Sequence, residues 1–143
     1  MKRGEIYEYD YLWLHEQKKG RKKGVKDRPT CLMIVSKKDP PVLYLYPITG
    51  SKPEAGASAI QIPADERKLA GLTKESWIVL SEMNSTSTTD EFKSAQPIGA
   101  FSAPFLAKVS GAAIKYIKSA KRIDRDDKPD RQAPQTTKPK KTV

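Results

Sequence analysis

Residues 28–50 read RPTCLMIVSKKDPPVLYLYPITG, and this stretch decides the fold. It contains two apolar runs, Thr30–Val35 and Val42–Thr49, separated by a turn at residues 39–41 (Asp-Pro-Pro). Apolar runs of this length, bounded by turn residues, are typical of strands, and the first run indicates a buried one. Proline is tolerated at the first residue of a strand, so Pro29 marks the start of that run.

The segment before this stretch alternates as a strand does from Gly4 to Leu14, and the next residues, 15–27, are charged and aperiodic. Successive strand side chains point to opposite faces of a sheet. One face of the predicted strand therefore carries Tyr7, Tyr9, Tyr11 and Trp13, and the other carries Ile6, Glu8, Asp10, Leu12 and Leu14. Residues 15–27 are expected to form a long flexible loop.

The residues after Gly50 predict further short elements. We expect an exposed loop at 50–57, a short strand at 58–62, and a helical turn at 63–69 that Gly71 ends. A strong strand at 77–83, a polar turn at 85–89 and a weaker strand at 94–101 should follow.

The last periodic segment indicates a helix. Ser102 is suited to cap it and Pro104 to occupy its first turn. Its apolar face is Phe105, Leu106, Val109, Ala112, Ala113, Tyr116 and Ile117. Short strands followed by one helix predict a mainly β fold with a C-terminal helix, arranged as a small closed barrel. We expect the domain to span residues 1–118, with 119–143 as a basic, disordered tail.

The charge of the chain lies in two places. The formal net charge is +10, and residues 18–28 contain seven Lys/Arg and one Asp. Residues 121–143 contain eight Lys/Arg and four Asp, which leaves the rest of the chain neutral. A neutral body with two cationic extensions favours a polyanionic partner such as nucleic acid. The alternative is that these charges only keep the protein in solution.

Composition also indicates the cellular compartment of the protein. The single cysteine, Cys31, excludes an internal disulfide. No apolar run is long enough to span a bilayer, and the N-terminus lacks the apolar segment of a secretion signal. We expect a soluble cytoplasmic protein that does not bind a membrane.

Several short motifs, in this order, resemble the MazF/PemK family of toxins. They are RGEIY at 3–7, HEQ at 15–17, RP at 28–29, PIT at 47–49 and GL at 71–72 before SWIV at 76–79. The resemblance covers residues 3–118 and implies an SH3-like barrel of the CcdB/MazF type. It further implies a homodimer with endoribonuclease activity on single-stranded RNA, neutralised by a cognate antitoxin. Such an enzyme uses the 2′-hydroxyl of the RNA as its nucleophile and needs no metal or cofactor.

The resemblance places the catalytic arginine at Arg28 and the catalytic threonine at Thr49. A guanidinium is always charged, and its planar fork matches phosphate oxygens. Thr49 ends a strand beside Gly50, and its β-branched side chain has few rotamers, which suits a fixed donor. Three further candidates for proton transfer are Glu82, Glu16 and His15. For each, an ordinary structural role is the alternative.

The basic loop is the candidate RNA-binding segment, through Gln17, Lys18, Lys19, Arg21, Lys22, Lys23 and Lys26. Two features depart from the family. Ten residues separate Gln17 from Arg28, where about three are expected, and Leu80 occupies a position where PemK-like members have arginine. The second departure favours a mechanism built on Arg28 and Thr49. Two other functions remain open: a CcdB-like gyrase poison, and a non-catalytic nucleic-acid-binding barrel.

Overall fold

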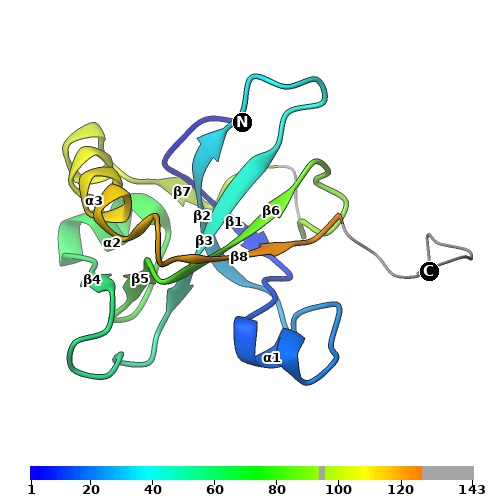
Figure 1. Ribbon diagram of the computed structural model, residues 1–143. Coiled ribbons are helices and arrows are strands. Elements are labelled where there is room, and N and C mark those ends of the chain that lie inside the picture. Colours follow the sequence, from blue (N-terminus) through cyan, green and yellow to red (C-terminus); the bar gives the residue numbers. More distant parts are fainter. Residues whose placement is uncertain (94–95, 127–143) are drawn as a thin grey trace, which may run out of the picture.

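The computed structural model describes residues 1–93 and 96–126. Its strands form one curled sheet, with a 14-residue helix near the C-terminal end of this part of the chain (Figure 1). The strands are β1 (Glu5–Tyr9), β2 (Arg28–Val35), β3 (Leu43–Thr49), β4 (Ala59–Gln61), β5 (Trp77–Val79), β6 (Glu82–Thr86), β7 (Gly99–Ala100) and β8 (Lys121–Asp124). The helices are α1 (Leu14–Lys18), α2 (Ala64–Ala70) and α3 (Ala103–Tyr116).

The sheet is antiparallel apart from one pair of strands. Its order is β4-β5-β3-β2-β1-β7, and β6 pairs with β3 and, in parallel, with β8. The long strand β3 changes partner along its length, since its start pairs with β6 and its end with β5. This change of partner curls the sheet into a half-barrel. The expected mainly β fold with a C-terminal helix is confirmed.

The two strands predicted from residues 28–50 are confirmed at the centre of this sheet. Their register pairs Thr30 with Pro47 and Leu32 with Leu45, and a β-bulge follows Leu32. The short peripheral strand β4, helix α2 and the C-cap at Gly71 also lie where the sequence predicted them. Gly71 has φ of +76°, the left-handed conformation that favours glycine at a helix end.

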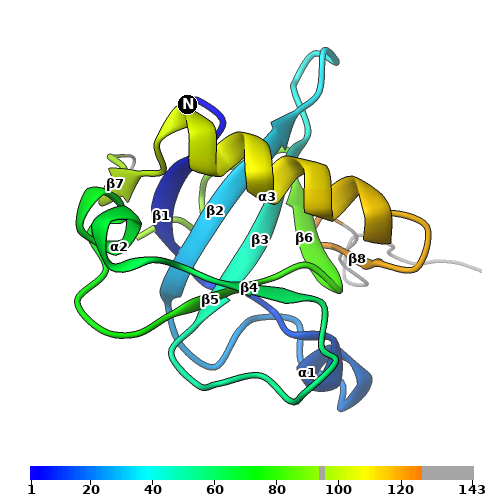
Figure 2. The ribbon, with the colours of Figure 1, turned by 90° about the vertical axis from the view of Figure 1, so that its left-hand side faces the viewer.

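The predicted alternation of β1 produces two apolar clusters on opposite faces of the sheet. Ile6 joins Cys31, Tyr46 and Ile48 beneath helix α3, which lies across the sheet in Figure 2. The opposite face buries Tyr7, Tyr9, Tyr11, Leu32, Leu43, Leu45 and Phe92. The tyrosines therefore pack inside the protein, and only Trp13 of the aromatic face is partly exposed.

Helix α3 begins as predicted. The Ser102 hydroxyl accepts a hydrogen bond from the Phe105 N–H, and Phe105, Val109 and Ala113 form the buried stripe. Glu66 of α2 accepts bonds from both the N–H and the hydroxyl of Ser102, which fixes α2 against the start of α3. No helix in the described residues is long and apolar enough to cross a membrane.

Some predicted boundaries are wrong. The strand expected at 77–83 is two strands, because the chain bends at Leu80–Ser81 to follow the curl of β3. Glu82 consequently begins a new strand, and Ser85–Thr86 belong to that strand rather than to a turn. The predicted first strand ends at Tyr9, and residues 14–18 form α1 instead of loop. Of the weak strand expected at 94–101, Gly99–Ala100 is a strand, and residues 94–95 lie outside the described residues.

The domain boundary expected at residue 118 also needs correction. Residues 121–124 form β8, which pairs with β6. Ile123 is fully buried and the Arg125 side chain is 1% exposed, so the folded domain extends at least to residue 126. One isoleucine among charged residues has no periodicity to reveal it, which is why the sequence pattern indicated a tail. The rest of the expected tail, 127–143, lies outside the described residues.

Candidate active site

Arg28 is the first residue of β2 and pairs with Tyr9 of β1. Its side chain is half-buried, and the guanidinium carbon lies 5.1 Å from the centre of the Trp13 ring. The Nε atom is buried and has no hydrogen-bond partner, and within residues 1–93 and 96–126 the guanidinium has no ion pair. A cation held on a ring face, with its charge unneutralised, is a suitable receptor for a phosphate.

The register of β2 and β3 relates Arg28 to Thr49. The pairing of β2 with β3 ends at Thr30 and Pro47, so Arg28 and Thr49 each lie two residues beyond the last pair, at the same end of the two strands. Thr49 is half-buried, and its hydroxyl oxygen accepts a hydrogen bond of 3.1 Å from the Ser51 N–H. That bond orients the oxygen and leaves the hydroxyl proton available for donation.

Trp13 organises the residues around Arg28, although the sequence marked it only as one member of an aromatic face. Its ring packs edge-on against buried Tyr11, with 5.1 Å between ring centres. The His15 imidazole is nearly parallel to the Trp13 ring, with 6.2 Å between centres. His15 is exposed, so solvent and a substrate can reach it. The Arg28 guanidinium and the imidazole therefore share one aromatic platform.

Glu16, a candidate for proton transfer, forms no ion pair with Arg28. It is 6% exposed, and its carboxylate accepts a hydrogen bond of 3.0 Å from the Trp13 N–H. That bond satisfies a free N–H at the start of α1, as a capping residue does. Glu16 therefore holds the backbone that carries Trp13, and its link to Arg28 is indirect.

Glu82, the first residue of β6, contacts the start of α1. One carboxylate oxygen accepts bonds from the Leu14 N–H (2.9 Å) and the Tyr11 hydroxyl (3.1 Å). Burial raises the pKa of the Glu82 carboxyl above its usual value, against the opposing effects of these two bonds and of nearby His15. Both donors to this oxygen come from the segment 11–14, which leads into α1.

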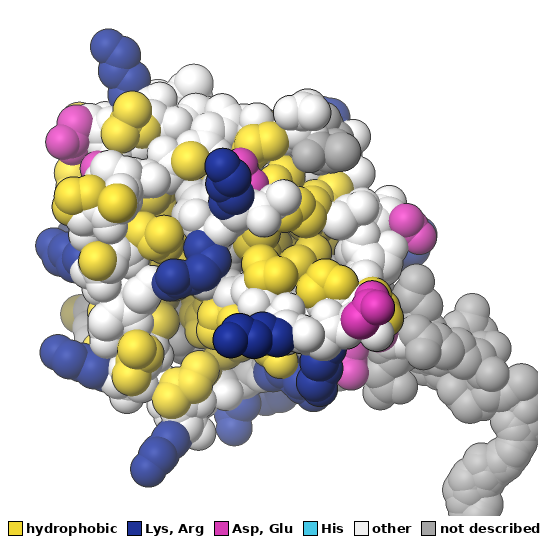
Figure 3. All heavy atoms as spheres, turned by 90° about the horizontal axis from the view of Figure 1, so that it is seen from above, with side chains coloured by type: hydrophobic (Ala, Val, Ile, Leu, Met, Phe, Trp, Pro, Cys, Tyr) yellow, Lys and Arg dark blue, Asp and Glu magenta, His cyan; other side chains and the backbone are white. Residues whose placement is uncertain are grey.

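The basic loop is exposed but anchored at one point. Gln17 and all the predicted RNA-binding cations of residues 18–26 are exposed. Arg21 donates to the backbone oxygens of Lys23 and Gly24, which curls the loop on itself. Gly24 packs so closely that a Cβ there would lie 2.1 Å from the Tyr11 carbonyl oxygen. The cations are thereby held beside α1. Figure 3, which views the molecule from above, shows hydrophobic side chains with Lys and Arg dispersed among them.

A buried ionic network fixes the segment that leads to Trp13. Arg125 forms ion pairs with Asp10 (3.4 Å) and Glu91 (2.5 Å) and donates to Asn84. The Asn84 amide in turn bonds both the N–H and the carbonyl of Leu12. Burial raises the pKa of Asp10, with Arg125 opposing. Neither Arg125 nor Asn84 was singled out in the sequence, because only the parallel pairing of β8 with β6 brings them together.

The fold thus gathers Arg28, Trp13, His15, Glu16 and Glu82 around α1. Thr49 lies at the same end of β2 and β3 as Arg28. The arrangement offers a cation for a phosphate, a hydroxyl donor, an exposed imidazole and a carboxylate of raised pKa. Within the described part of the chain, no group of three or more His, Cys, Asp or Glu side chains is placed to hold a metal ion.

Comparisons with known proteins agree with this geometry at the level of the fold. A solved endoribonuclease from a mycobacterial species, in complex with its cognate antitoxin, superposes with a TM-score of 0.58. The match is 12% identical in sequence and covers 82% of this chain and 95% of that one. The chain shares the fold of this solved endoribonuclease.

A second solved structure, the Mycobacterium tuberculosis toxin MazF-mt6, is 19% identical over 78% of this chain and 96% of its own, with a TM-score of 0.49. No protein-family model matches the sequence, and no curated protein does either. The likeness to solved proteins is therefore one of fold, at low sequence identity.

Proposed function

We propose that this protein is a cytoplasmic toxin that cleaves single-stranded mRNA as a metal-independent endoribonuclease. The observation that carries the proposal is the half-buried Arg28 guanidinium, which lies over the Trp13 ring without an ion-pair partner in residues 1–93 and 96–126. Thr49 lies at the same end of β2 and β3 as Arg28. A structural arginine so placed would ordinarily be paired with a carboxylate. The likeness to an endoribonuclease fold supports the same function.

The proposed reaction needs only groups of the RNA and of this site. The 2′-oxygen of one nucleotide attacks the adjacent phosphorus, and its proton passes to a base. Arg28 and the Thr49 hydroxyl stabilise the charge that develops on the non-bridging oxygens. The P–O5′ bond then breaks and the 5′-oxygen takes up a proton. The products are a 2′,3′-cyclic phosphate and a 5′-hydroxyl.

Two groups qualify for the proton transfers. His15 is exposed beside the platform, and its imidazole nitrogens can accept or donate a proton. Glu82 has a raised pKa but is partly covered by Leu14 and Tyr11. We assign the direct transfer to His15 and a supporting electrostatic role to Glu82. Loss of cleavage in Glu82→Gln, with cleavage retained in His15→Ala, would reverse this assignment.

The test incubates the purified chain with single-stranded RNA in EDTA, together with Arg28→Ala and Arg122→Ala. Arg122 is an exposed arginine on β8 and controls for the change in charge. We expect cleavage by the unmodified chain and by Arg122→Ala, and a loss of at least a hundredfold in Arg28→Ala. Cleavage that requires Mg²⁺, or that survives Arg28→Ala undiminished, contradicts the mechanism.

The non-catalytic alternative has one observation in its favour, the exposed cations of the basic loop, which would suffice for RNA binding alone. Salt-sensitive RNA binding with no strand scission in the same assay would select it. Inhibition of gyrase supercoiling, with RNA left intact, would select the CcdB-like alternative.

We further propose that the protein forms a homodimer and is neutralised by a cognate antitoxin. Ile34, Ile114 and Ile117 are exposed hydrophobic residues around a shallow hollow between β2 and α3. Exposed apolar clusters of this kind often mark protein–protein contacts. Light scattering after size-exclusion chromatography should give twice the mass of the chain. A monomer at micromolar concentration contradicts the homodimer.

A further inference from the structure

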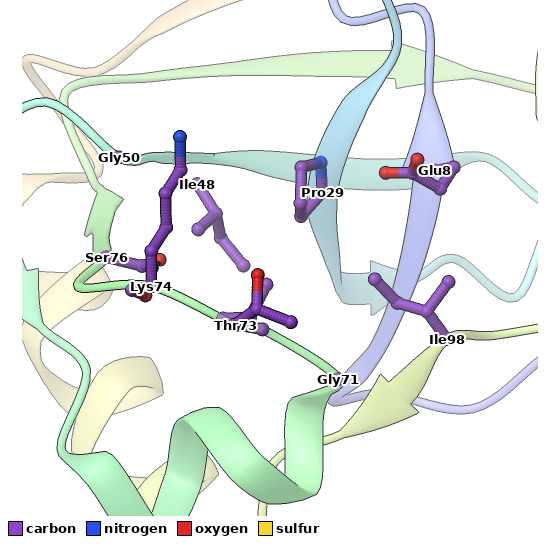
Figure 4. Close-up of a pocket in the computed structure, with 10 residues that line it drawn as sticks. Glu8, Pro29, Ile48, Gly50, Gly71, Thr73, Lys74, Ser76 and Ile98 are labelled. Atoms are coloured by element: carbon purple, nitrogen blue, oxygen red, sulfur yellow. Dashed lines mark hydrogen bonds between the residues drawn. The ribbon is translucent and has the colours of Figure 1, made fainter.

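A hollow of about 290 Å³ lies on the sheet face opposite Arg28, between the central strands and the segment that follows α2 (Figure 4). Its floor is Pro29 of β2 and Ile48 of β3, with Leu72 and Ile98 adding apolar walls. Pro29 follows Arg28 in the chain and Ile48 precedes Thr49. The hollow and the candidate active site therefore sit at the same end of the same strands.

Two charged side chains stand at opposite ends of this floor in Figure 4, Glu8 from β1 and Lys74 from the 71–76 segment. The Glu8 side chain is half-buried, and its carboxylate has no hydrogen-bond partner among the residues that the structure describes. Lys74 passes over Gly50, where an added Cβ would lie 2.6 Å from its Cε. The ammonium is thus packed against the backbone next to Thr49.

The chemistry of the hollow matches a nucleobase. Its apolar floor can take the face of a flat ring, and its volume is at the lower end of the range for small-molecule sites. The carboxylate at one end presents two acceptors side by side. Guanine alone among the four RNA bases offers two adjacent donors, N1–H and N2–H₂, on its Watson–Crick edge. The other three place an acceptor at one of these positions.

We propose that this pocket binds a guanine of the RNA next to the cleaved phosphate, and the proposal rests on the proposed ribonuclease function. Glu8 accepts both hydrogen bonds from the guanine edge, and Pro29 and Ile48 support the ring. Lys74, beside Thr49, contacts the connecting phosphate. Glu8 is then the residue that determines which base is selected.

A binding experiment tests the pocket without relying on cleavage. The chain is titrated with GMP, AMP, CMP and UMP, and amide NMR shifts are followed at Glu8, Ile48 and Thr73. We expect GMP to bind tightest, by roughly tenfold to a hundredfold over AMP. Glu8→Gln replaces one acceptor by a donor and so matches the N6 amino group and N1 acceptor of adenine. That variant should prefer AMP.

Glu54→Gln is the matched control, since it removes the same charge from an exposed loop residue outside the pocket. It should keep the preference of the unmodified chain. Equal affinity for all four nucleotides, or a guanine preference that survives Glu8→Gln, overturns the proposal.

Sequencing the 5′ ends of RNA fragments then separates this inference from the function on which it rests. We expect a guanine at one fixed position near each cut, replaced by adenine for Glu8→Gln. Cleavage without a preferred base, together with unselective nucleotide binding, overturns the pocket and leaves the ribonuclease standing. Selective GMP binding without cleavage of any RNA overturns the ribonuclease and leaves the guanine pocket standing.

Discussion

At the scale of single residues, two features distinguish this site from ordinary surface: a cation that has no ion pair in residues 1–93 and 96–126, and the aromatic ring on which it lies. A guanidinium over an indole ring is stabilised by about 1 kcal/mol where it is partly desolvated. Trp13 supplies that contact to Arg28 and also carries the neighbouring imidazole of His15. The position of Arg28 therefore depends on a residue that performs no chemistry.

Replacing Trp13 tests that dependence. Trp13→Ala should lower kcat/KM for RNA cleavage by roughly tenfold, because the guanidinium loses its support and becomes mobile. Trp13→Phe keeps a ring face and should lose less. Steady-state kinetics on a short RNA measure both. Equal losses in the two variants would mean that the ring is not the platform for Arg28.

The raised pKa of Glu82 predicts how the stability of the protein depends on pH. The pKa of the Glu82 carboxyl is raised in the folded protein, so folding disfavours its ionised form. The protonated carboxyl therefore contributes stability at low pH, and this contribution is lost as the pH rises through the folded pKa. Glu82→Gln removes this loss and retains an oxygen for the Leu14 and Tyr11 donors. The Tm of the variant relative to the unmodified chain should therefore be more favourable at pH 7 than at pH 4. A difference independent of pH would contradict the raised pKa.

At the scale of elements, the short strand β8 positions Arg125, which helps to hold the segment from Asp10 to Leu12 that precedes Trp13. Arg125 follows β8 and is surrounded by Asp10, Glu91 and the Asn84 amide, and its guanidinium lies over the Tyr9 ring at 5.2 Å. The pairing of β8 with β6 is what carries this arginine into the interior. The same network reaches Leu12 through Asn84, one residue before Trp13.

Arg125→Met should therefore destabilise the protein by about 3–5 kcal/mol, because two partly buried carboxylates lose their counter-charge. Arg122→Ala, an exposed arginine on the same strand, should change stability by no more than about 0.5 kcal/mol. Urea unfolding followed by circular dichroism measures both. Similar stabilities of the two variants would show that the network contributes little.

At the scale of the whole molecule, the positive charges of the basic loop, residues 18–28, lie beside the candidate active site. The exposed lysines of the basic loop begin at the last residue of α1, so an RNA strand attracted to them would arrive close to the proposed site. Such attraction acts through the release of counterions and weakens as salt concentration rises.

Replacing Lys18, Lys19, Lys22, Lys23 and Lys26 by Gln should weaken RNA binding for all sequences alike. The slope of log affinity against log salt should fall by about 0.7 for each phosphate contact that is lost. Fluorescence anisotropy with single-stranded RNA, measured at several salt concentrations, gives this slope. An unchanged slope would mean that the loop does not contact the RNA backbone.

The amino-acid sequence by itself determined the central strands, the two faces of β1, the cap of α3 and the identity of the Arg28 and Thr49 candidates. These features are local, since hydrophobic periodicity, turn residues and short motifs are written in consecutive positions. Only the tertiary structure decided the bend at residues 80–81, the burial of Arg125, the Trp13 platform and the Glu8 pocket. Each of these features depends on contacts between residues that are far apart in the sequence. The curl of β3 determines which strands lie next to one another and so which of these contacts form.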